Sequence, residues 1–432
     1  MRRSMLCMLL LGLFVGGIAP AQTIDTGRPT LADLFQQARS RPDIQDAELA
    51  TAEASAAQEQ AAAGLYPKVF GIGRVESYNS PTNLRPLPPT EVNPAKGEAV
   101  PFSDTITRYG LVFQMPLYVQ PLYTLSRKTA VLLEKANIQR QIELVRKEAA
   151  IVSLNSSLYA LEGLEAALLS REKSLQETLK TLRIRVDSGK TPESEWMKVD
   201  RLILDIQRQR VDVERRKSQV FRDLFQHTGV TLTGSVPMTL VSSIRTAPYP
   251  ALLAAGKDVD AARFEARRVR EQFYPSLSIE GSLLENDGTA YNTDTHVHRS
   301  YDSVAVMLKL PLFEKEIWSA GRVAEIREAR SRQGYEKLRI ELEALDAELE
   351  RRFPLLDSAL RLAEQSVTRA GELLDIARVA YSVERMTTEE YLRYEADVLS
   401  AEAERCRSID DRWQALAQKA VLYGQLLEGI IQ

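Results

Sequence analysis

The sequence predicts a mainly α-helical chain in which long helices alternate with four short amphipathic strands. Three observations lead to this prediction. The chain of 432 residues repeats its own pattern once, its longest polar segment carries a helical heptad, and the segments between the helices alternate between apolar and polar residues. The formal net charge of -3 argues against nucleic acid as a partner, because nucleic acid favours a basic face.

The first residues, 1–21, have the features of a secretory signal peptide. Two arginines precede a short apolar core, and the triplet at 19–21 fits a small-x-small cleavage site. The apolar core is shorter than the roughly 20 residues that a transmembrane helix needs, and no later stretch is as apolar, which argues against a helical membrane protein. Beyond this leader the chain keeps one cysteine, Cys406, so no internal disulfide is expected.

Two copies of one pattern make up the rest of the chain. Tyr66-Pro67 corresponds to Tyr274-Pro275 at an offset of 208, and the later prolines correspond at an offset of 195. Each copy contains a helix, a strand pair, a long helix, a turn and another long helix. The expected units are a first repeat at 22–228 with strands at about 67–117, a proline-punctuated link at 229–250, and a second repeat at 251–432 with strands at about 275–311.

The long helices have the spacing of a coiled coil. Residues 122–186 contain no proline, and leucine recurs at every seventh residue from 154 to 182. At about 1.5 Å per residue such a helix is on the order of 100 Å long, which suits a rod or a tube. The equivalent positions of the second copy are mostly alanine, so we expect the two seams to interdigitate. The two series are Leu154, Leu161, Leu168, Leu175 and Leu182, and Leu349, Leu356, Ala363, Ala370 and Ala377.

Two turns reverse the helices, at 186–196 and 381–391. Gly189 suits the C-terminal cap of the first long helix. The second turn contains no glycine, so we expect it to be built differently. Thr387 or Thr388 can cap the helix that follows it.

The segments between the helices alternate with the period of β-strands. At 107–115, 276–283 and 303–310 one face is apolar and the other polar, whereas at 68–78 either face can be the outward one. Strands of about ten residues with one apolar face suit a membrane barrel, although a half-buried soluble sheet has the same pattern. The connection at 286–299 reads as a polar loop.

The number of strands sets a further condition. Four strands cannot close a barrel, for which about eight is the usual minimum. Strands in a membrane leave no open edge, because unpaired backbone groups are too costly in lipid. If these strands lie in a membrane, several chains must therefore share one barrel.

Few residues in the chain could support chemistry. His296 and His298, in the predicted polar loop, do not complete a metal site. The sequence has no nucleophile elbow, and its glycine-rich stretches do not match nucleotide-binding motifs. We expect no enzymatic activity, no cofactor and no bound metal.

The order and spacing of these pieces resemble the TolC-like outer-membrane efflux proteins, the outer-membrane factors of Gram-negative bacteria. The resemblance covers nearly all of the mature chain and includes the tandem repeat, the "LYP" and "FYP" stretches and the "MPLY" and "LPLF" stretches. It implies a homotrimer in which each chain contributes four strands to a shared twelve-stranded β-barrel, continued by a long coiled-coil α-barrel across the periplasm. Pro67, Pro116, Pro275 and Pro311 then mark the helix–strand switches.

The resemblance also implies a function. Such a duct docks on a periplasmic adaptor (membrane fusion) protein and an inner-membrane pump. It passively conducts drugs, metal ions or secreted polypeptides, as in tripartite efflux or type I secretion. A soluble periplasmic coiled-coil adaptor or scaffold is the alternative, which the two matched strand pairs disfavour.

In the family the periplasmic tip narrows to an aperture. Glu195 and Glu390 match acidic tip positions and Tyr381 matches a tip tyrosine. Two positions differ from the family pattern, because Arg393 occupies a second acidic position and Met386 an arginine position. Alternatively, the two glutamates are ordinary exposed helix carboxylates and the turns are simply solvated. The turn residues expected to contact the adaptor are Gly189, Lys190, Thr191, Arg385 and Thr387.

Overall fold

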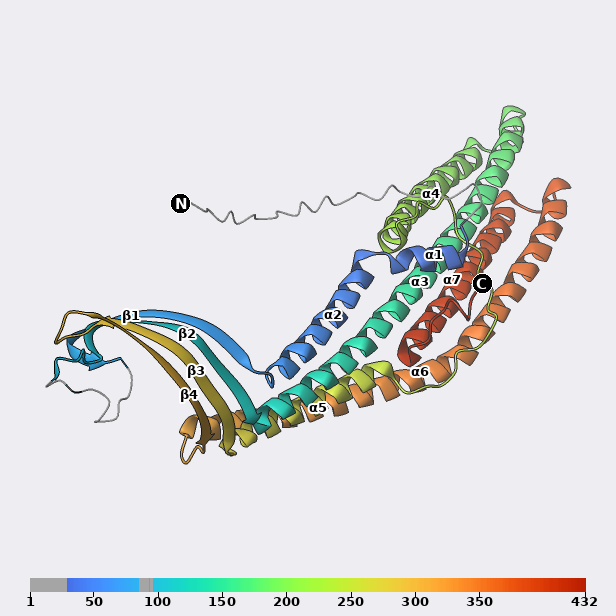
Figure 1. The fold of residues 1–432 in the computed structure, drawn as a ribbon. Helices are drawn as coiled ribbons and strands as arrows, with labels where there is room; N and C mark the ends of the chain where they lie inside the picture. Colours follow the sequence, from blue (N-terminus) through green and yellow to red (C-terminus); the bar gives the residue numbers. More distant parts are fainter. Residues whose placement is uncertain (1–28, 85–92, 94–95) are drawn as a thin grey trace, which may run out of the picture.

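The computed structural model describes residues 29–84, 93 and 96–432, so the predicted signal peptide lies outside the described residues. The molecule is elongated. Four strands lie side by side at one end, and two helical hairpins extend towards the other (Figure 1). The elements are α1 (Leu31–Arg39), α2 (Pro42–Ala63), β1 (Lys68–Asn83), β2 (Phe102–Tyr118), α3 (Gln120–Asp187), α4 (Glu193–Thr228), α5 (Pro250–Arg270), the 3-10 helix η2 (Glu271–Phe273), β3 (Ser276–Thr289), β4 (His296–Lys309), α6 (Lys315–Ser382) and α7 (Thr388–Tyr423). Of the helices described, none is both long enough and apolar enough to span a membrane.

The two copies of the sequence pattern form helices of equal length. Helices α3 and α6 have 68 residues each, α4 and α7 have 36 each, and corresponding bounds differ by 195. The shorter helices α2 and α5 begin at Pro42 and Pro250, which are 208 residues apart. The helix lengths and spacings thus match the offsets of the internal repeat expected from the sequence. Pro250, the last residue of the predicted link, already belongs to α5.

The two turns at the hairpin ends have the same backbone geometry. Gly189 has a φ of 71°, and Glu384, at the equivalent position of the second copy, has a φ of 60°. In each turn the amide of the following residue, Lys190 or Arg385, donates to the carbonyl five residues earlier over 2.9 Å, as in a Schellman motif. The expectation that the second turn is built differently is wrong, because Glu384 adopts the left-handed conformation that usually favours glycine.

The leucine series of α3 closes its own hairpin. Leu168 and Leu175 are buried in a cluster with residues of α4, among them Val199. The alanine series of α6 lies in the second hairpin instead, where Ala377 clusters with Tyr391 of α7. The expectation that the large and small series face each other is therefore wrong, since the leucine cluster contains residues of α4 and of α7, Leu392 and Leu399, but none of the alanine series.

The two hairpins contact each other through α3 and α7, and this interface contains buried charge. Arg171 of α3 and Glu395 of α7 have side chains 8% and 4% exposed, with Nη1 3.5 Å from Oε2. Arg171 also donates to the Leu392 carbonyl over 3.2 Å, and the Ser174 hydroxyl donates to Glu395. Burial lowers the pKa of Arg171. Each charge thus depends on the other for compensation of its lost hydration.

The link between the repeats is fixed halfway along the molecule, close to α1 and the last residues of the chain (Figure 1). The fully buried Asn155 of α3 donates to the Val236 carbonyl over 2.7 Å and accepts from its amide over 2.8 Å. A single β-bridge joins Leu240 of the link to Ile431. These contacts satisfy the backbone of a non-helical segment and hold it against both repeats.

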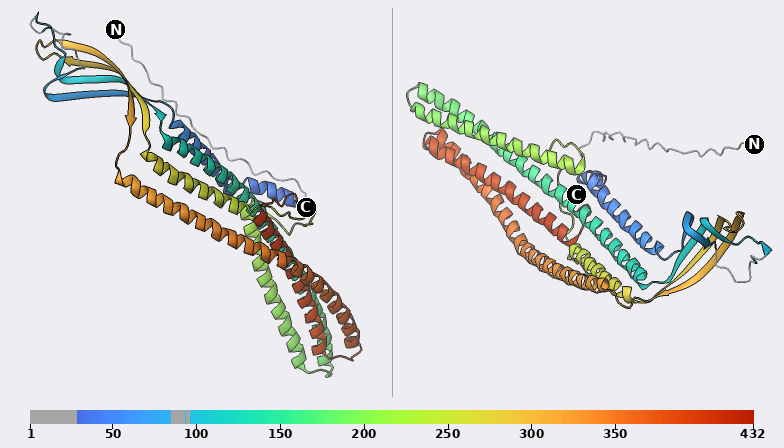
Figure 2. Two further views of the ribbon diagram at one scale, coloured as in Figure 1. Left: turned by 90° about the horizontal axis from the view of Figure 1, so that it is seen from below. Right: turned by 90° about the vertical axis from the view of Figure 1, so that its left-hand side faces the viewer.

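The strands form one antiparallel sheet in the order β1-β2-β3-β4, so β1 and β4 are its edges (Figure 2). One cross-strand row consists of Val69, Phe113, Gly281 and Val304. The next row on the same side contains Leu111 and Leu283, so the alternating patterns predicted from the sequence share one face. We name it the apolar face. It carries odd-numbered residues of β1, β2 and β3 and even-numbered residues of β4, and it is apolar in the half of the sheet nearer the helices. Towards the β3–β4 connection the same side carries polar residues, namely Glu285, Asp287, His296, His298 and Asp302. Val75 also belongs to the apolar face, which settles the orientation of 68–78.

The opposite side, the polar face, is connected by side-chain hydrogen bonds. Gln114 donates to Glu280 over 3.0 Å between β2 and β3. The hydroxyls of Ser282 and Ser303 lie 2.7 Å apart between β3 and β4. The guanidinium of Arg108 likewise pairs with a glutamate of β1. The sheet therefore separates an apolar surface from a hydrogen-bonded one.

The strands are longer than the sequence predicts. Strand β4 begins at His296, so His296 and His298 lie in a strand and the prediction of a loop there is wrong. The two ring nitrogens of His298 lie 2.9 Å from a Glu285 oxygen and 3.0 Å from an Asp287 oxygen. Within the described part of the chain no group of three or more histidine, cysteine or acidic residues is arranged to hold a metal ion.

Removing one partner of the buried pair between the hairpins tests its contribution. We expect Glu395→Ala to lower the free energy of unfolding by about 3–5 kcal/mol, because Arg171 is then buried without its carboxylate. Replacing both residues, as Arg171→Met with Glu395→Leu, is expected to cost much less. Thermal unfolding in detergent, followed by helical circular dichroism, measures both.

The matched control is Glu404→Ala, at an exposed ion pair on the same helix. Surface pairs contribute about 0–1 kcal/mol, so this variant is expected to unfold close to the wild-type temperature. Equal unfolding temperatures for Glu395→Ala and Glu404→Ala would contradict the assignment.

Candidate functional site

The residues predicted for the aperture and for adaptor contact all lie at the free ends of the two hairpins (Figure 1). Gly189, Lys190, Arg385 and Thr387 are exposed there, and Thr191 is half-buried. The left-handed conformation of Gly189 turns the chain between α3 and α4. This end of the molecule therefore presents short polar turns, with their side chains directed into solvent in the single chain.

Glu390 has a local structural partner in Thr387. The Thr387 amide and hydroxyl donate to one Glu390 oxygen over 3.0 and 2.9 Å, and the Glu390 amide donates back to the hydroxyl over 3.2 Å. This capping box begins α7. The hydrogen bonds from Thr387 hold the pKa of Glu390 below its usual value, with a smaller contribution from the exposed Arg393. Glu390 is thus ionised at neutral pH and fixed in direction.

Glu195 lies in the first turn of α4 and accepts a hydrogen bond from Lys198 over 2.8 Å. In the described chain no hydrogen bond or ion pair joins Glu195 to Glu390 or to Tyr381. Within one chain, therefore, the two glutamates are not brought together.

Tyr381 belongs to an aromatic cluster at the hairpin end. Its ring stacks on that of Tyr391 with centroids 4.7 Å apart, and the Arg185 guanidinium lies 5.4 Å from its centroid. Met386 packs against the same cluster. Arg185 also lies 3.5 Å from a Glu384 oxygen. Arg185 of α3 therefore links the first hairpin to the turn of the second.

Two of these linking groups were missed by the sequence analysis. Arg185 and Glu384 are charged residues in turns rich in charge, and nothing in the sequence distinguishes them. Arg171 carries a recognisable signal, because it follows Leu168 by three residues and so occupies the second apolar position of a heptad. A charged residue at such a position indicates a buried polar contact.

The four switch prolines lie at the junction between helices and sheet. Pro67 and Pro275 directly precede β1 and β3. Pro311 lies between β4 and α6. Pro116 instead lies within β2, next to a register shift, and the strand continues to Tyr118. Three of the prolines therefore stand where the chain changes structure, and the fourth stands two residues before such a change.

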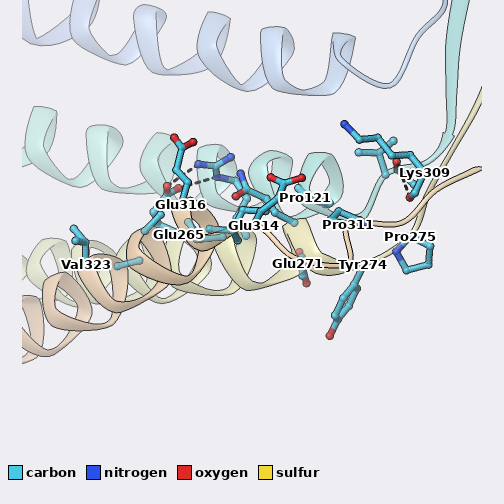
Figure 3. A pocket seen from close by; sticks show the side chains of 18 of the residues that line it. Pro121, Glu265, Glu271, Tyr274, Pro275, Lys309, Pro311, Glu314, Glu316 and Val323 are labelled. Carbon is cyan, nitrogen blue, oxygen red and sulfur yellow. Dashed lines mark hydrogen bonds and ion pairs between the residues drawn. The ribbon is translucent and has the colours of Figure 1, made fainter.

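Exposed aromatic side chains gather at the same junction. Figure 3 shows the Tyr274 side chain directed away from the pocket that lies there. Aromatic side chains with apolar bodies are enriched at boundaries between membrane and water. The exposed aromatic residues are Tyr66, Tyr118, Tyr274, Phe313 and Trp318.

The junction pocket is walled by carboxylates that tie α5 to α3 (Figure 3). The buried Glu271 accepts a hydrogen bond from Thr124 of α3. Glu265 of α5 accepts hydrogen bonds from Arg268 over 2.8 Å and from Lys128 of α3 over 3.1 Å. The hydrogen bond from Arg268 is the main cause that lowers the pKa of Glu265 to about 2. These groups tie α5 and η2 to α3 beside the base of the sheet.

The comparison with known proteins agrees with this geometry. Residues 246–424 match the family model described as outer membrane efflux protein. No curated protein matches the chain in sequence. Solved structures match it closely in fold.

Three of these structures are outer membrane proteins from different bacteria. VceC from Vibrio cholerae is 15% identical, with a TM-score of 0.77 over 91% of this chain and 96% of that one. The CmeC channel of Campylobacter jejuni is 15% identical, with a TM-score of 0.76 over 93% and 85%. The open MtrE channel of Neisseria gonorrhoeae is 16% identical, with a TM-score of 0.74 over 92% and 89%. The predicted fold class is therefore confirmed, and the match to the outer membrane efflux protein family covers residues 246–424, most of the second repeat.

Proposed function

We propose that three copies of this chain form a passive exit duct through the outer membrane of a Gram-negative bacterium, continued across the periplasm by their helices. The observation that carries the proposal is the sheet, which has one apolar face, one polar face and two free edges. The similar solved structures, which include outer membrane channels, support the same location.

The two edges of the sheet require partners. The outer sides of β1 and β4 carry backbone groups that no strand of this chain pairs in the described residues. In lipid such groups must be paired within protein, and β4 of one copy can pair with β1 of the next. Three copies supply twelve strands, above the minimum of about eight for closure. The apolar face then meets lipid and the polar face lines the lumen.

The helical part has unpartnered sides as well. Because α3 and α7 are the helices that join the hairpins, α4 and α6 lie on the outside of each hairpin pair. Both helices carry a series of apolar residues spaced seven apart, and every apolar member is at least half exposed. Ser218 interrupts the series on α4, and Arg369 interrupts the series on α6. Pairing α4 of one copy with α6 of the next buries both series as a coiled-coil seam. The two series are Met197, Leu204, Val211 and Phe225, and Leu355, Leu362, Ile376 and Val383.

The hairpin ends form the periplasmic aperture in this proposal. A ring of three copies brings Glu195 and Glu390 of each chain towards one axis, where six carboxylates favour cations and repel each other. Tyr381 and Arg393 complete the aperture residues. The stacking of Tyr381 on Tyr391 and the contact of Arg185 with both the ring and Glu384 support a closed resting state of the hairpins.

The exposed turns are the surface on which a periplasmic adaptor docks. Gly189, Lys190, Thr191, Arg385 and Thr387 are its proposed contacts, and an inner-membrane pump supplies the cargo through the adaptor. This arrangement fits tripartite efflux and type I secretion alike. The two repeats, 22–228 and 251–432, would then contribute one docking turn each.

Cysteine cross-linking tests the trimer at the helical seam. We expect Leu204→Cys combined with Ile376→Cys or Leu373→Cys to give covalent species of two and three chains of 48.5 kDa on non-reducing gels of outer membranes. Leu373 and Ile376 lie about one helical turn apart on α6, so the two pairs allow for a shift of that size in the alignment of α4 with α6. The native Cys406 is buried and can remain.

The matched control joins Leu204→Cys with Leu355→Cys, which lies on the same exposed series but 21 residues from Ile376, about 30 Å along the helix. Cross-linking of the control pair alone, or monomers from both test pairs, would count against the proposed seam.

Charge removal tests the aperture. We expect Glu195→Gln with Glu390→Gln to lower the preference of single channels for potassium over chloride, because six carboxylates leave the axis. Glutamine keeps an oxygen for the capping box with Thr387, so α7 is expected to begin as before. Glu404→Gln, far from the turns, is the control. An unchanged reversal potential in a salt gradient would rule out these residues as the aperture charge.

Site-specific photo-crosslinking tests the docking surface. A photoreactive residue at Lys190 or Arg385 is expected to label an adaptor in the native host, whereas one at the exposed Glu404 is not. Equal labelling at all three positions would remove the turns as specific contacts.

A further inference from the structure

The polar face of the sheet carries a row of arginines whose role is not explained by the fold. The register places four residues directly opposite one another across the four strands: Arg74, Arg108, Asn286 and Arg299. Every lysine and arginine of the four strands lies on this face, and none lies on the apolar face. Positive charge is thus gathered on one side of the sheet and concentrated in one row.

The positive charge of this row is only partly neutralised. One carboxylate, Glu76, bridges two of its arginines, with an oxygen 2.8 Å from Arg74 Nε and the other 2.9 Å from Arg108 Nε. Arg299 donates to the neutral His298 carbonyl over 2.8 Å, and no carboxylate of the described residues pairs with it. Three guanidinium groups and one carboxylate leave two positive charges per chain.

Of the three arginines, Arg108 connects strands through several hydrogen bonds, whereas Arg74 and Arg299 do not. Arg108 donates to the Leu84 carbonyl over 3.0 Å and to Asn286 over 3.1 Å, so it anchors the outer end of β1 to β3. The Arg74 side chain is 72% exposed, and within the described residues its ion pair is with Glu76. Like charges directly opposite each other destabilise a sheet, and the single carboxylate of Glu76 compensates one of the two charges of the Arg74–Arg108 pair.

The row also offers more hydrogen-bond donors than the protein uses. Asn286 is fully buried, and its amide nitrogen has no partner among the described residues. Guanidinium groups present donors in a planar fork that matches the oxygens of carboxylate, sulfate and phosphate groups. The row contains three guanidinium groups but only one carboxylate, Glu76, among the described residues paired with it, so it has more donors than negatively charged acceptors.

We propose that this row forms an arginine belt around the lumen that binds oxyanionic groups and favours anionic cargo at the outer end of the duct. The proposal rests on the proposed function, in which three chains share the barrel and the polar face lines it. The belt then contains nine arginines and three glutamates. It lies towards the sheet end away from the helices, because Asn286 and Arg299 flank the β3–β4 connection.

Such a belt has the opposite polarity to the acidic aperture at the hairpin ends. A low-dielectric wall around the lumen focuses the field of fixed charges, so six uncompensated positive charges raise the local concentration of anions. The chemical class expected to feel the belt is therefore a molecule with clustered carboxylate, sulfate or phosphate oxygens.

Inorganic tripolyphosphate is a suitable probe, because it is a compact polyanion of phosphate oxygens. We expect it to reduce the current of the purified wild-type protein in planar lipid bilayers in a concentration-dependent way. In Arg74→Gln with Arg299→Gln the half-blocking concentration is expected to rise about tenfold or more, because the trimer loses six charges. The variant is also expected to become less permeable to chloride relative to potassium.

Two further variants separate the belt from general charge and from folding defects. Lys68→Gln with Lys309→Gln removes the same charge from the same face near the helices, and is expected to leave tripolyphosphate block within about twofold of wild type. Arg74→Lys with Arg299→Lys keeps the charge but not the fork, and is expected to retain most of the block. Heat-sensitive trimers on gels verify assembly of each variant.

The outcomes distinguish the belt from the duct. A wild-type protein that conducts but is not blocked, or a block equally weakened in the arginine and lysine-to-glutamine variants, overturns the belt and leaves the duct intact. A protein that forms no channel at all overturns the proposed duct, and the belt with it.

Discussion

A β-strand in lipid must have every backbone N–H and C=O group paired within protein, and the rest of this structure depends on that constraint. One chain supplies four strands in one sheet, with β1 and β4 left at the edges. Exposing the apolar face to water is unfavourable. Placing the sheet of a single chain in lipid is also unfavourable, because its two edges are unpaired. Sharing of strands between copies resolves both conditions at once.

The helices are arranged in a way that suits the same sharing. Helices α3 and α6 have equal lengths, and each is the element that follows a strand, β2 or β4, along the chain. The apolar series on α4 and α6 lie on the outer sides of the hairpin pair, as the free strand edges lie on the outer sides of the sheet. Glu265 of α5 and Glu271 of η2 bond to α3 near the point where helices meet strands.

Within this frame the buried pair of Arg171 and Glu395 differs from the other interhelical contacts. The leucine and alanine series each help to close one hairpin, and the hairpins meet each other through apolar residues such as Leu392 and Leu399 of α7 as well as through charged and hydroxyl groups. The charged pair adds little net stability, since desolvation offsets most of the attraction. It lies between the parts that must move apart if the hairpin ends open.

Much of the fold could be predicted from the sequence because the decisive patterns are local. The heptads of 122–186 and the alternation at 303–310 each depend on residues a few positions apart. Partner choice was not predictable in the same way. The seam containing Leu175 packs on α4 and not on the alanine series of α6, which is a matter of long-range packing.

Single backbone and register effects were also beyond the sequence. Glu384 takes a left-handed conformation because the surrounding turn outweighs its intrinsic preference. The sequence indicates Thr387 or Thr388 as the cap of α7, but the reciprocal bonds between Thr387 and Glu390 depend on the backbone geometry of the turn. The arginine row depends on the register of three strand pairs, since Arg74, Arg108 and Arg299 are far apart in the sequence.

The most direct test of the account is the mass of the assembled protein in detergent. Outer membranes from a Gram-negative host expressing the full-length chain are extracted and run on a gel with and without boiling. The account predicts a heat-sensitive species near three times 48.5 kDa that becomes a monomer on boiling. A monomer in both lanes, recovered from the soluble periplasm, would contradict the shared sheet.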